Sequence, residues 1–479
     1  MLDSGLVIAL NGAALARQLG DWRGSAPHRP RYQQLAAAVR ALVLDGRVPL
    51  GVRLPAEREL AARLAISRTT VTTAYDALRE QGYLVTRQGA GTFAALPAGT
   101  RADWSGGSGA PLDLAVASPE ADPGVLGPAV QRAVDRLPLH LGGHGYDVLG
   151  LPVLRAAVAE RFAARGLPTT PDQVLITSGA MGALSLVAQA LLAPGDRVLT
   201  DVPSYPNTLD ALRRAGGRLA PVALLDDGWD LDLVESAYRQ VLPRLAYVVA
   251  DYANPTGHLL PVEGRARVVR AAARAGATLL VDEAWADLRL DGPVVPRPVA
   301  SHDDEGRVLT VGSMSKSHWG GLRVGWLRGP AATVARVAEA RATVDLAPPV
   351  LDQLVAVELL RDDAAVPAQR ERVRLRRDVL MQALQEACPD WSFVVPGGGL
   401  SLWVRLHAPV ATALSASAAR EGVRLVPGGR FTADGTAERF VRLPYSLPPD
   451  QLREAVRRLA AAREHLSTAP SSGPHVAVA

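Results

Sequence analysis

Lysine is almost absent from this chain of 479 residues, since Lys316 is the single lysine among 52 basic residues. Surface charge therefore does not depend on lysine, and a retained amine points to a role that arginine cannot fill. Arginine stays protonated at physiological pH and forms no Schiff base, whereas a desolvated lysine amine does. The alternative is that one lysine escaped the bias towards arginine by chance.

Cysteine and long apolar runs are also scarce. The single cysteine, Cys388, excludes a disulfide bond within the chain and suits a reducing compartment. No apolar run approaches the roughly 18 residues of a membrane span, and the first ten residues lack the basic segment of a signal peptide. We therefore expect a cytoplasmic protein without a membrane partner, and we predict no metal site.

Positive charge is concentrated near the N-terminus. Residues 29–94 hold ten arginines and five acidic residues, a net charge of +5, while the whole chain carries +4. A basic segment joined to a nearly neutral remainder is typical of a nucleic-acid-binding domain. Solvated helices can carry the same charge, so the order of the elements has to decide.

That order predicts a winged helix-turn-helix. Helical spacing of apolar residues covers 32–45, a second short helix begins at 54–57, and Ser67 caps a third helix that ends at Gly82. Two short strands, 83–86 and 92–94, follow as a hairpin. In this arrangement the N-terminal residues of the third helix meet base edges in the major groove.

The residues expected to contact DNA lie on the helices and at the wing. They are Tyr32, Arg53, Arg58, Ser67, Arg68, Thr69, Thr70, Arg87 and Gly89. Four stretches resemble the DNA-binding domain of the GntR family: 49–61, 67–71, 82–84 and 89–93. The resemblance implies double-stranded operator DNA as a partner, contacted by Arg53, Arg58 and Arg68. The alternative is a winged helix that docks another protein.

We divide the chain into a flexible N-terminal segment, the DNA-binding domain, a linker, a second domain and a flexible tail. Their bounds are 1–28, 29–95, 96–111, 112–466 and 467–479. The linker is rich in glycine and contains proline, and as a flexible coil it would reach roughly 20–25 Å.

The second domain alternates apolar strands with helical patterns, which predicts an α/β fold with parallel strands. The candidate strands are 174–177, 197–200, 246–250, 278–281 and 308–311. Open α/β sheets bind ligands at the carboxyl ends of their strands. Polar residues follow several of these strands, so we expect a ligand site there.

The polar residues at and after these strand ends together describe a site for pyridoxal 5'-phosphate. Lys316 would supply the Schiff base, and Asp282, which ends an apolar strand, needs a cationic partner such as a protonated pyridine nitrogen. The helix that begins at Ser178-Gly179-Ala180 suits a phosphate at its N-terminus. The other residues expected at the cofactor are Tyr205, Asn254, Ser313, Ser315 and Arg323. Each alone has a structural alternative, such as a turn, a helix cap or core packing.

The order of these motifs over about 112–462 resembles fold-type I aminotransferase-like proteins. The resemblance implies that Tyr146 reaches the phosphate of a neighbouring subunit in a homodimer, and that Asn254 contacts the ring hydroxyl. It also implies that Arg442 binds a substrate carboxylate as a fork; the alternative is that Arg442 pairs with an acidic residue of the small domain. Trp285 stands where that family has a tyrosine beside the ring, and indole donates but does not accept a hydrogen bond.

A winged helix followed by an aminotransferase-like body resembles the MocR subfamily of GntR regulators. The resemblance implies a transcription regulator whose body senses pyridoxal phosphate or an amino compound and repositions the DNA-binding domains. An active aminotransferase with an accessory DNA-binding domain is the alternative, favoured by the presence of Lys316, Asp282 and Arg442. A third hypothesis is a cofactor-free body that serves as a platform for dimerisation.

Overall fold

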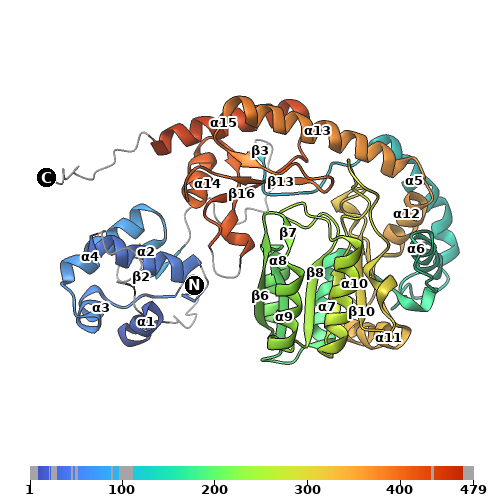
Figure 1. Cartoon of the computed structure of the whole chain (residues 1–479), viewed down its shortest axis with the longest axis horizontal. Helices are drawn as coiled ribbons and strands as arrows, with labels where there is room; N and C mark the ends of the chain where they lie inside the picture. Colours follow the sequence, from blue (N-terminus) through green and yellow to red (C-terminus); the bar gives the residue numbers. More distant parts are fainter. Residues whose placement is uncertain are drawn as a thin grey trace. The chain divides into compact units, whose positions relative to one another are not determined.

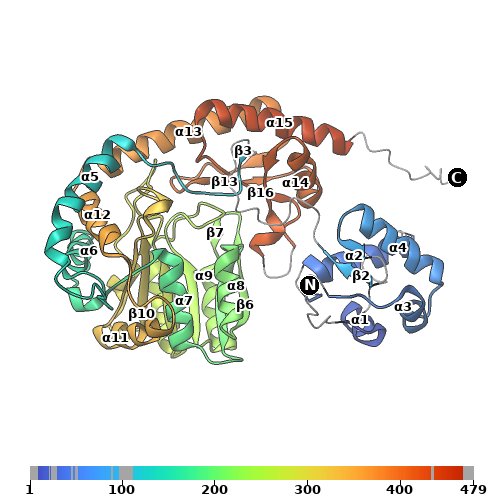
Figure 2. The same cartoon turned by 180° about the vertical axis from the view of Figure 1, so that it is seen from behind.

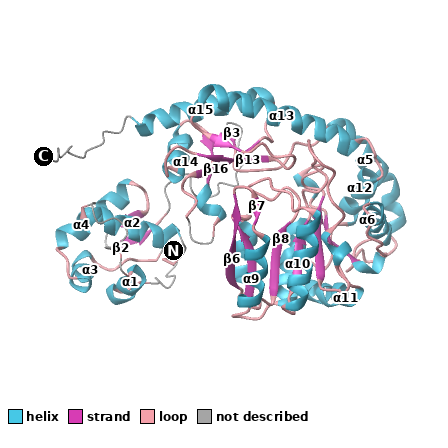
Figure 3. Cartoon of the chain, in the orientation of Figure 1, coloured by secondary structure: helices cyan, strands magenta, loops and turns pink. Residues whose placement is uncertain are grey.

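The chain folds as two compact units, residues 1–110 and 111–479, and each has its own apolar core. The computed structural model describes residues 9–20, 22, 30–44, 47–48, 52–87, 90–95, 112–432 and 436–467. Figure 1 labels the elements, and Figure 3 distinguishes helices from strands. The linker assigned to 96–111 and the tail beyond 467 lie outside the described residues.

The first unit is a winged helix-turn-helix. Its elements are α1 (Gly12–Leu19), α2 (Arg31–Leu44), α3 (Glu57–Leu64), α4 (Arg68–Glu80), β1 (Leu84–Arg87) and β2 (Gly91–Ala94). The two strands pair antiparallel as the wing. Leu35, Leu60 and Val71 are fully buried between the helices, and the Tyr75 hydroxyl donates to the carbonyl of Pro55 at 3.1 Å. This core fixes α4 against α3.

Helix α1 was not expected, because residues 1–28 were assigned to a flexible segment. That assignment is wrong for 12–19. Asn11 caps the helix by accepting a hydrogen bond from the amide of Ala14, and Leu15, Leu19 and Trp22 pack into the core of the unit. A helix of eight residues is stable only through packing of this kind, and periodicity over so short a stretch does not reveal it.

The body is built around an eight-stranded sheet in the order β4-β11-β10-β9-β8-β5-β6-β7. The strands are β4 (Val174–Thr177), β5 (Arg197–Val202), β6 (Arg218–Leu225), β7 (Gly228–Trp229), β8 (Leu245–Val249), β9 (Thr278–Asp282), β10 (Val308–Ser313) and β11 (Gly325–Arg328). The five expected strands are all present. β6, β7 and β11 were not expected, and β11 separates β4 from β10 by pairing antiparallel with both.

Helices cover both faces of this sheet, as Figures 1 and 2 show from opposite sides. They are α5 (Pro123–Arg136), α6 (Pro152–Ala164), α7 (Gly179–Leu191), α8 (Pro206–Arg214), α9 (Leu231–Val241), α10 (Val262–Arg274), α11 (Ala331–Ala340) and α12 (Val350–Leu360). Successive residues of β8 serve the two faces: Tyr247 belongs to the core with α7, and Val248 to the core with α10. Burial on both faces explains why the central strands are continuously apolar.

A smaller lobe carries a four-stranded sheet of order β12-β13-β16-β15. Its elements are α13 (Ala365–Ala387), β12 (Ser392–Phe393), β13 (Ser401–Arg405), α14 (Ala411–Arg420), β14 (Val423–Arg424), β15 (Val426–Pro427), β16 (Phe440–Pro444) and α15 (Pro449–Ser467). The first described residues after the linker, β3 (Leu112–Asp113), pair in parallel with β14. Among the described residues, no helix combines the length and hydrophobicity needed to cross a bilayer.

Candidate ligand and DNA-binding sites

The predicted ligand-binding residues of the body lie where the strands of the large sheet end. Asp282 is the last residue of β9, and Ser313 is the last of β10, three positions before Lys316. Ser178 follows β4, and Tyr205 follows β5. Since β5, β8, β9 and β10 run parallel, these ends meet at one edge of the sheet.

The amine of Lys316 is enclosed by the body. Its Nζ donates to the carbonyl of Ala117 at 2.7 Å and lies 4.8 Å from the ring centroid of the buried Trp285. Burial and the positive charges of Arg442 and Arg323 together lower the pKa of the amine to about 8, and the charge of Asp282 opposes the shift. The amine is therefore far more nucleophilic at neutral pH than that of an ordinary lysine.

Asp282 receives only neutral donors from its immediate surroundings in the described structure. The amide of Ala284 donates to Oδ1 at 2.9 Å, and the hydroxyl of Tyr247 donates to Oδ2 at 2.9 Å. Burial raises the pKa of Asp282, while these two hydrogen bonds and the charge of Lys316 oppose the shift. A cation placed at this carboxylate would be strongly favoured. Tyr247 escaped the sequence analysis because it lies in the middle of an apolar strand, with no motif around it.

The side chain of Arg323 packs closely against the N-terminus of α7. Gly179 has φ +78°, and a Cβ there would lie 2.8 Å from Nη2 of Arg323. Arg323 itself adopts the left-handed region at φ 53°, which is uncommon for a residue with a side chain. Its Nη2 donates to the carbonyl of Ser178 at 2.8 Å. The first amides of a helix have no partner within the helix, so this end suits an anion.

The serines around this end differ in what they contact. The hydroxyls of Ser313 and Ser315 lie 2.8 Å apart, and the amide of Ser315 donates to Ser313 Oγ. Ser178 instead donates to Oδ2 of Asp345 at 3.2 Å. Ala180 lies in the first turn of α7, and a Cβ on Gly325 would come within 2.8 Å of its amide. The helix start is thus packed tightly against β11.

Arg442 is buried, with 4% of its surface exposed. It donates from Nη1 to Oδ1 of Asn254 at 3.4 Å and from Nη2 to the carbonyl of Ala115. Its Nε has no partner among the described residues. Burial lowers the pKa of Arg442 to about 10. The contacts of Arg442 are therefore neutral acceptors and the ring of Phe431, 5.1 Å away, rather than a carboxylate, which leaves it able to receive an anion.

Tyr205 and Tyr146 differ in their relation to this site. Tyr205 is half-buried, its hydroxyl accepts from Asn207 at 2.8 Å, and burial raises its pKa while the charge of Arg442 opposes the shift. Tyr146 is 61% exposed, and its ring lies 5.7 Å from that of His144. The structure thus gathers Tyr205 with Asn254 and Arg442 but leaves Tyr146 on the surface.

The chemistry of these donors fits pyridoxal phosphate. The α7 N-terminus with Ser313, Ser315 and Arg323 would hold the phosphate, and Asp282 would face the ring nitrogen. Lys316 is the primary amine that reacts with an aldehyde, and the unpartnered Nε of Arg442 remains for a carboxylate.

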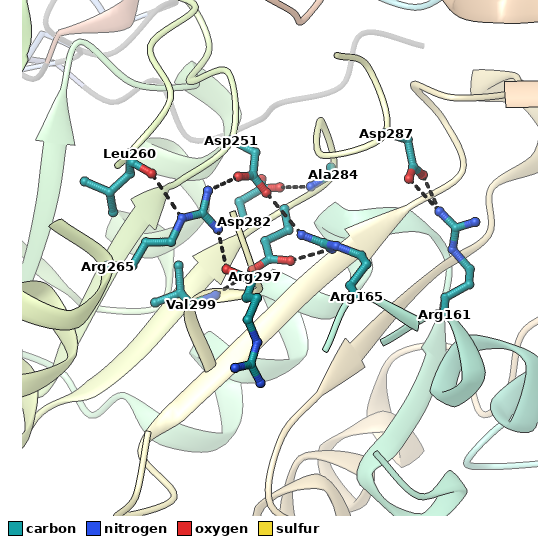
Figure 4. A network of polar contacts seen from close by, with 11 residues as sticks. Arg161, Arg165, Asp251, Leu260, Arg265, Asp282, Ala284, Asp287, Arg297 and Val299 are labelled. Atoms are coloured by element: carbon teal, nitrogen blue, oxygen red, sulfur yellow. Dashed lines mark hydrogen bonds and ion pairs between the residues drawn. The ribbon is translucent and has the colours of Figure 1, made fainter. Parts of the chain in front are cut away.

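A buried ionic network braces the strand ends from the opposite side (Figure 4). Asp251, which follows β8, pairs with the fully buried Arg265, and Arg165, the residue after α6, pairs with Glu283 at 2.8 Å. Arg265 also donates to the carbonyls of Leu260 and Arg297 at 3.0 Å. Neighbouring residues on a strand face opposite sides, so Glu283 anchors the position from which Asp282 faces the site. Sequence reasoning missed this network.

The start of α4 presents the predicted recognition residues to solvent. Ser67 caps the helix by accepting from the amide of Thr70 at 3.1 Å, and its hydroxyl lies 2.8 Å from that of Thr70. Thr69 is exposed. The side chain of Arg68 is 71% exposed and lies 3.9 Å from Oε2 of Glu57, at the limit of an ion pair. Thr69 and Arg68 are therefore free to reach base edges.

The predicted phosphate contacts are also exposed where the structure describes them. Arg53 and Arg58 are exposed, and Tyr32 is half-buried with its hydroxyl accepting from Gln33 at 3.1 Å. Arg53 packs near the wing, since a Cβ on Gly91 would lie 3.0 Å from its Cδ. Arg87 ends β1, but its side chain and Gly89 lie outside the described residues.

Both units match known families. Residues 31–94 match the gntR family of bacterial regulatory proteins, and residues 138–459, more than half of the chain, match aminotransferase class I and II. The HTH-type transcriptional regulator TauR of Rhodobacter capsulatus is 33% identical over 482 residues, covering 92% of this chain and 97% of that protein. The probable rhizopine catabolism regulatory protein MocR of Rhizobium meliloti is 28% identical over 470 residues, covering 90% and 94%.

The chain belongs to the MocR subfamily of GntR transcription regulators. This MocR-type regulator thus joins a GntR-type DNA-binding domain to an aminotransferase-like body. Enzymes resemble the body alone: the 2-aminoadipate transaminase of Thermus thermophilus is 32% identical over 324 residues, covering 66% of this chain and 80% of that enzyme.

Solved structures resemble the body of the MocR-type regulator. The α-aminoadipate aminotransferase of Thermus thermophilus, complexed with N-(5'-phosphopyridoxyl)-L-leucine, has a TM-score of 0.68 and 30% identity, covering 74% of this chain and 93% of that one. The kynurenine aminotransferase of Pyrococcus horikoshii, complexed with PMP, has a TM-score of 0.69 and 25% identity, covering 75% and 92%. Each of these two aminotransferase structures contains a phosphopyridoxyl compound.

Proposed function

We propose that the body of this regulator binds pyridoxal phosphate at Lys316, senses an amino compound there, and thereby controls the DNA-binding unit. One observation carries the proposal: two enclosed cations, Lys316 and Arg442, lie close enough to interact, and the nearby carboxylate of Asp282 receives hydrogen bonds only from the neutral groups of Ala284 and Tyr247 in the described structure. Such an arrangement is costly to fold unless a ligand of matching charge completes it.

When bound, the cofactor supplies an aldehyde, which condenses with a primary amine, and a ring, which withdraws electrons. Lys316 offers the amine, and its lowered pKa keeps part of it neutral near pH 7. Asp282 would hold a proton on the ring nitrogen, while Arg323 and the start of α7 would bind the phosphate. Arg442 would receive the carboxylate of an amino acid that displaces Lys316.

A homodimer is part of this proposal. Tyr146 is exposed, together with Leu139, Leu141 and Val148 in the same stretch of chain. Contiguous exposed apolar residues mark interaction surfaces, and a two-fold axis would place this stretch against the same stretch of a second copy. Tyr146 would then be in a position to serve the phosphate site of the partner.

Mass spectrometry tests the cofactor claim directly. The full-length protein is incubated with pyridoxal phosphate, reduced with borohydride and digested, and the modified peptide should contain Lys316. A Lys316→Arg protein is the matched control, because it keeps the charge and removes the amine. Modification of the control, or no modification of the unaltered protein at saturating cofactor, would refute the proposal.

An active aminotransferase is the second candidate function. Lys316, Asp282 and Arg442 are all present, and the body is similar to 2-aminoadipate transaminase of Thermus thermophilus. Turnover distinguishes the two candidates. A sensor should bind amino acids without multiple cycles of amino transfer to 2-oxo acids, whereas an enzyme should convert many equivalents per site.

A further inference from the structure

The first described segment after the linker crosses the ligand site. Residues 112–118 begin with β3. The amides of Leu112 and Leu114 donate to the carbonyls of Gly422 and Arg424 at 2.9 Å. Two alternate carbonyls then turn into the site: that of Ala115 accepts from Arg442, and that of Ala117 accepts from Lys316. The segment thus contacts both enclosed cations.

The carbonyl of Val116, which lies between those of Ala115 and Ala117 along the chain, has a different partner. Ser446 donates from its hydroxyl to the carbonyl of Val116 at 2.9 Å, and Ser118 donates to the carbonyl of Ser315 at 3.3 Å. Leu114 and Ala117 are buried and pack into the core of the body, whereas Val116 between them is 50% exposed. Two apolar anchors and a few hydrogen bonds therefore hold the segment over the site.

We infer that residues 112–118 form a strap that occupies the positions a ligand needs, so that binding releases the strap and moves the end of the linker. This inference rests on the proposed function of the site. A carboxylate on Arg442 competes with the carbonyl of Ala115, and a charged acceptor binds a guanidinium more strongly than a neutral one. Condensation of the neutral Lys316 amine with an aldehyde forms a C=N bond and releases water, which takes both hydrogens of the amine, so the hydrogen bond that the carbonyl of Ala117 accepts is lost.

A path of contacts leads from the strap towards the linker. The amide of Ala115 donates to Oδ1 of Asp113 at 2.8 Å, and Oδ2 of Asp113 pairs with Arg424 at 3.2 Å. Displacing Ala115 therefore disturbs the contacts of Asp113, one of the two residues of β3. Because the linker ends at 111, this short pairing is where a change in the site would reach the chain that joins the two units.

Hydrogen exchange of the full-length protein tests the strap. The probe is N-(5'-phosphopyridoxyl)-L-leucine, which carries both a phosphate and a carboxylate; the matched probe, N-(5'-phosphopyridoxyl)-3-methylbutylamine, lacks the carboxylate. The leucine probe should speed exchange of the amides of Leu114 and Ala115, the second probe should do so less, and a peptide from α9 should not change. If the leucine probe binds and exchange in 112–118 stays the same, the strap is refuted and the site stands. If neither probe binds, the proposed function itself fails.

A pair of serine variants measures how strongly the strap competes. Ser446→Ala removes a bond to the strap, so the leucine probe should bind about two- to tenfold more tightly. The control is Ser417→Ala. It removes a similar hydrogen bond, from the buried hydroxyl of Ser417 to the carbonyl of Ala462 at 2.9 Å, which does not involve the strap. The affinity of this control for the leucine probe should equal that of the unaltered protein. Equal affinities for both variants would refute the strap. If Ser446→Ala does not fold, Ser118→Ala makes the same comparison.

Discussion

The cationic side chains of the DNA-binding unit and those of the ligand site in the body differ in their exposure to solvent. Arg53, Arg58 and Arg68 are exposed, and the Arg68 side chain keeps 71% of its surface open. Arg442 keeps 4%, and burial lowers the pKa of Lys316 to about 8. The first group faces water until DNA arrives, while the second has already lost water and is held by backbone carbonyls.

This difference predicts two kinds of binding. Exposed arginines gain affinity by releasing counterions from phosphates, so their contribution falls with salt. Buried cations have paid the cost of desolvation in advance, so they favour a ligand whose charges and shape match the site. DNA affinity should therefore follow ionic strength, and ligand affinity should follow chemical identity.

The largest effect is expected at Lys316. Lys316→Ala and Lys316→Arg should both abolish covalent attachment of pyridoxal phosphate, because neither provides a free amine, while the fold stays intact. Visible absorbance of the bound cofactor measures attachment, and circular dichroism checks the fold. A Lys316→Arg protein that still acquires the absorbance band would remove the reason for treating this lysine as special.

Arg442 should have the next largest effect, on the ligand alone. Arg442→Ala should weaken N-(5'-phosphopyridoxyl)-L-leucine by about 1.5–3 kcal/mol, the usual size of a charge-assisted hydrogen bond. The carboxylate-free probe should bind both proteins almost equally, and saturation with pyridoxal phosphate should remain. Isothermal titration measures all three affinities. Equal losses for both probes would make Arg442 a structural residue.

The exposed arginines should respond differently from one another. Arg68→Ala should cost about 1–3 kcal/mol and relax the preference at one base position if it reads a base edge. Arg58→Ala should weaken binding to all sequences and reduce the salt slope by about one, as loss of a phosphate contact does. Anisotropy titrations over a series of salt concentrations and operator variants distinguish these outcomes. Identical losses on every sequence would mean that α4 is not the recognition helix.

The smallest effect concerns pH. Since the pKa of Lys316 is lowered to about 8, the rate of cofactor attachment should rise roughly tenfold per pH unit below that value and level off above it. Arg442→Gln removes a positive charge that lowers this pKa, so the midpoint should move to higher pH. DNA affinity should change little over the same range, because arginine stays charged. A rate that keeps rising towards pH 10 would indicate an ordinary, solvated lysine.

The sequence identified candidate site residues that stand in recognisable motifs. It did not identify residues that act through packing or through backbone groups. Lys316, Asp282 and Asn254 stand at strand ends, where apolar runs stop at a polar residue, and this makes them visible. Tyr247 donates to Asp282 from the middle of β8, so nothing in the local pattern distinguishes it from a core residue.

The fold shows the same division. The continuously apolar central strands were predicted, while β11 was not: its four residues begin with Gly325 and end with Arg328, so they do not form a continuous apolar run. The carbonyls of Ala115 and Ala117 have no signature at all, because every residue carries one and only tertiary structure directs it. The sequence of this protein therefore does not reveal which backbone groups cover the site.

The central claim is that occupancy of the site at Lys316 controls the DNA-binding unit. The most direct measurement is the affinity of the full-length protein for its own upstream DNA, with and without pyridoxal phosphate and the leucine probe, for the unaltered protein and for Lys316→Ala. We expect pyridoxal phosphate to change the DNA affinity of the unaltered protein and to leave that of Lys316→Ala unchanged. Equal DNA affinities for the unaltered protein with an empty site and with a site shown by mass to be fully modified would contradict it.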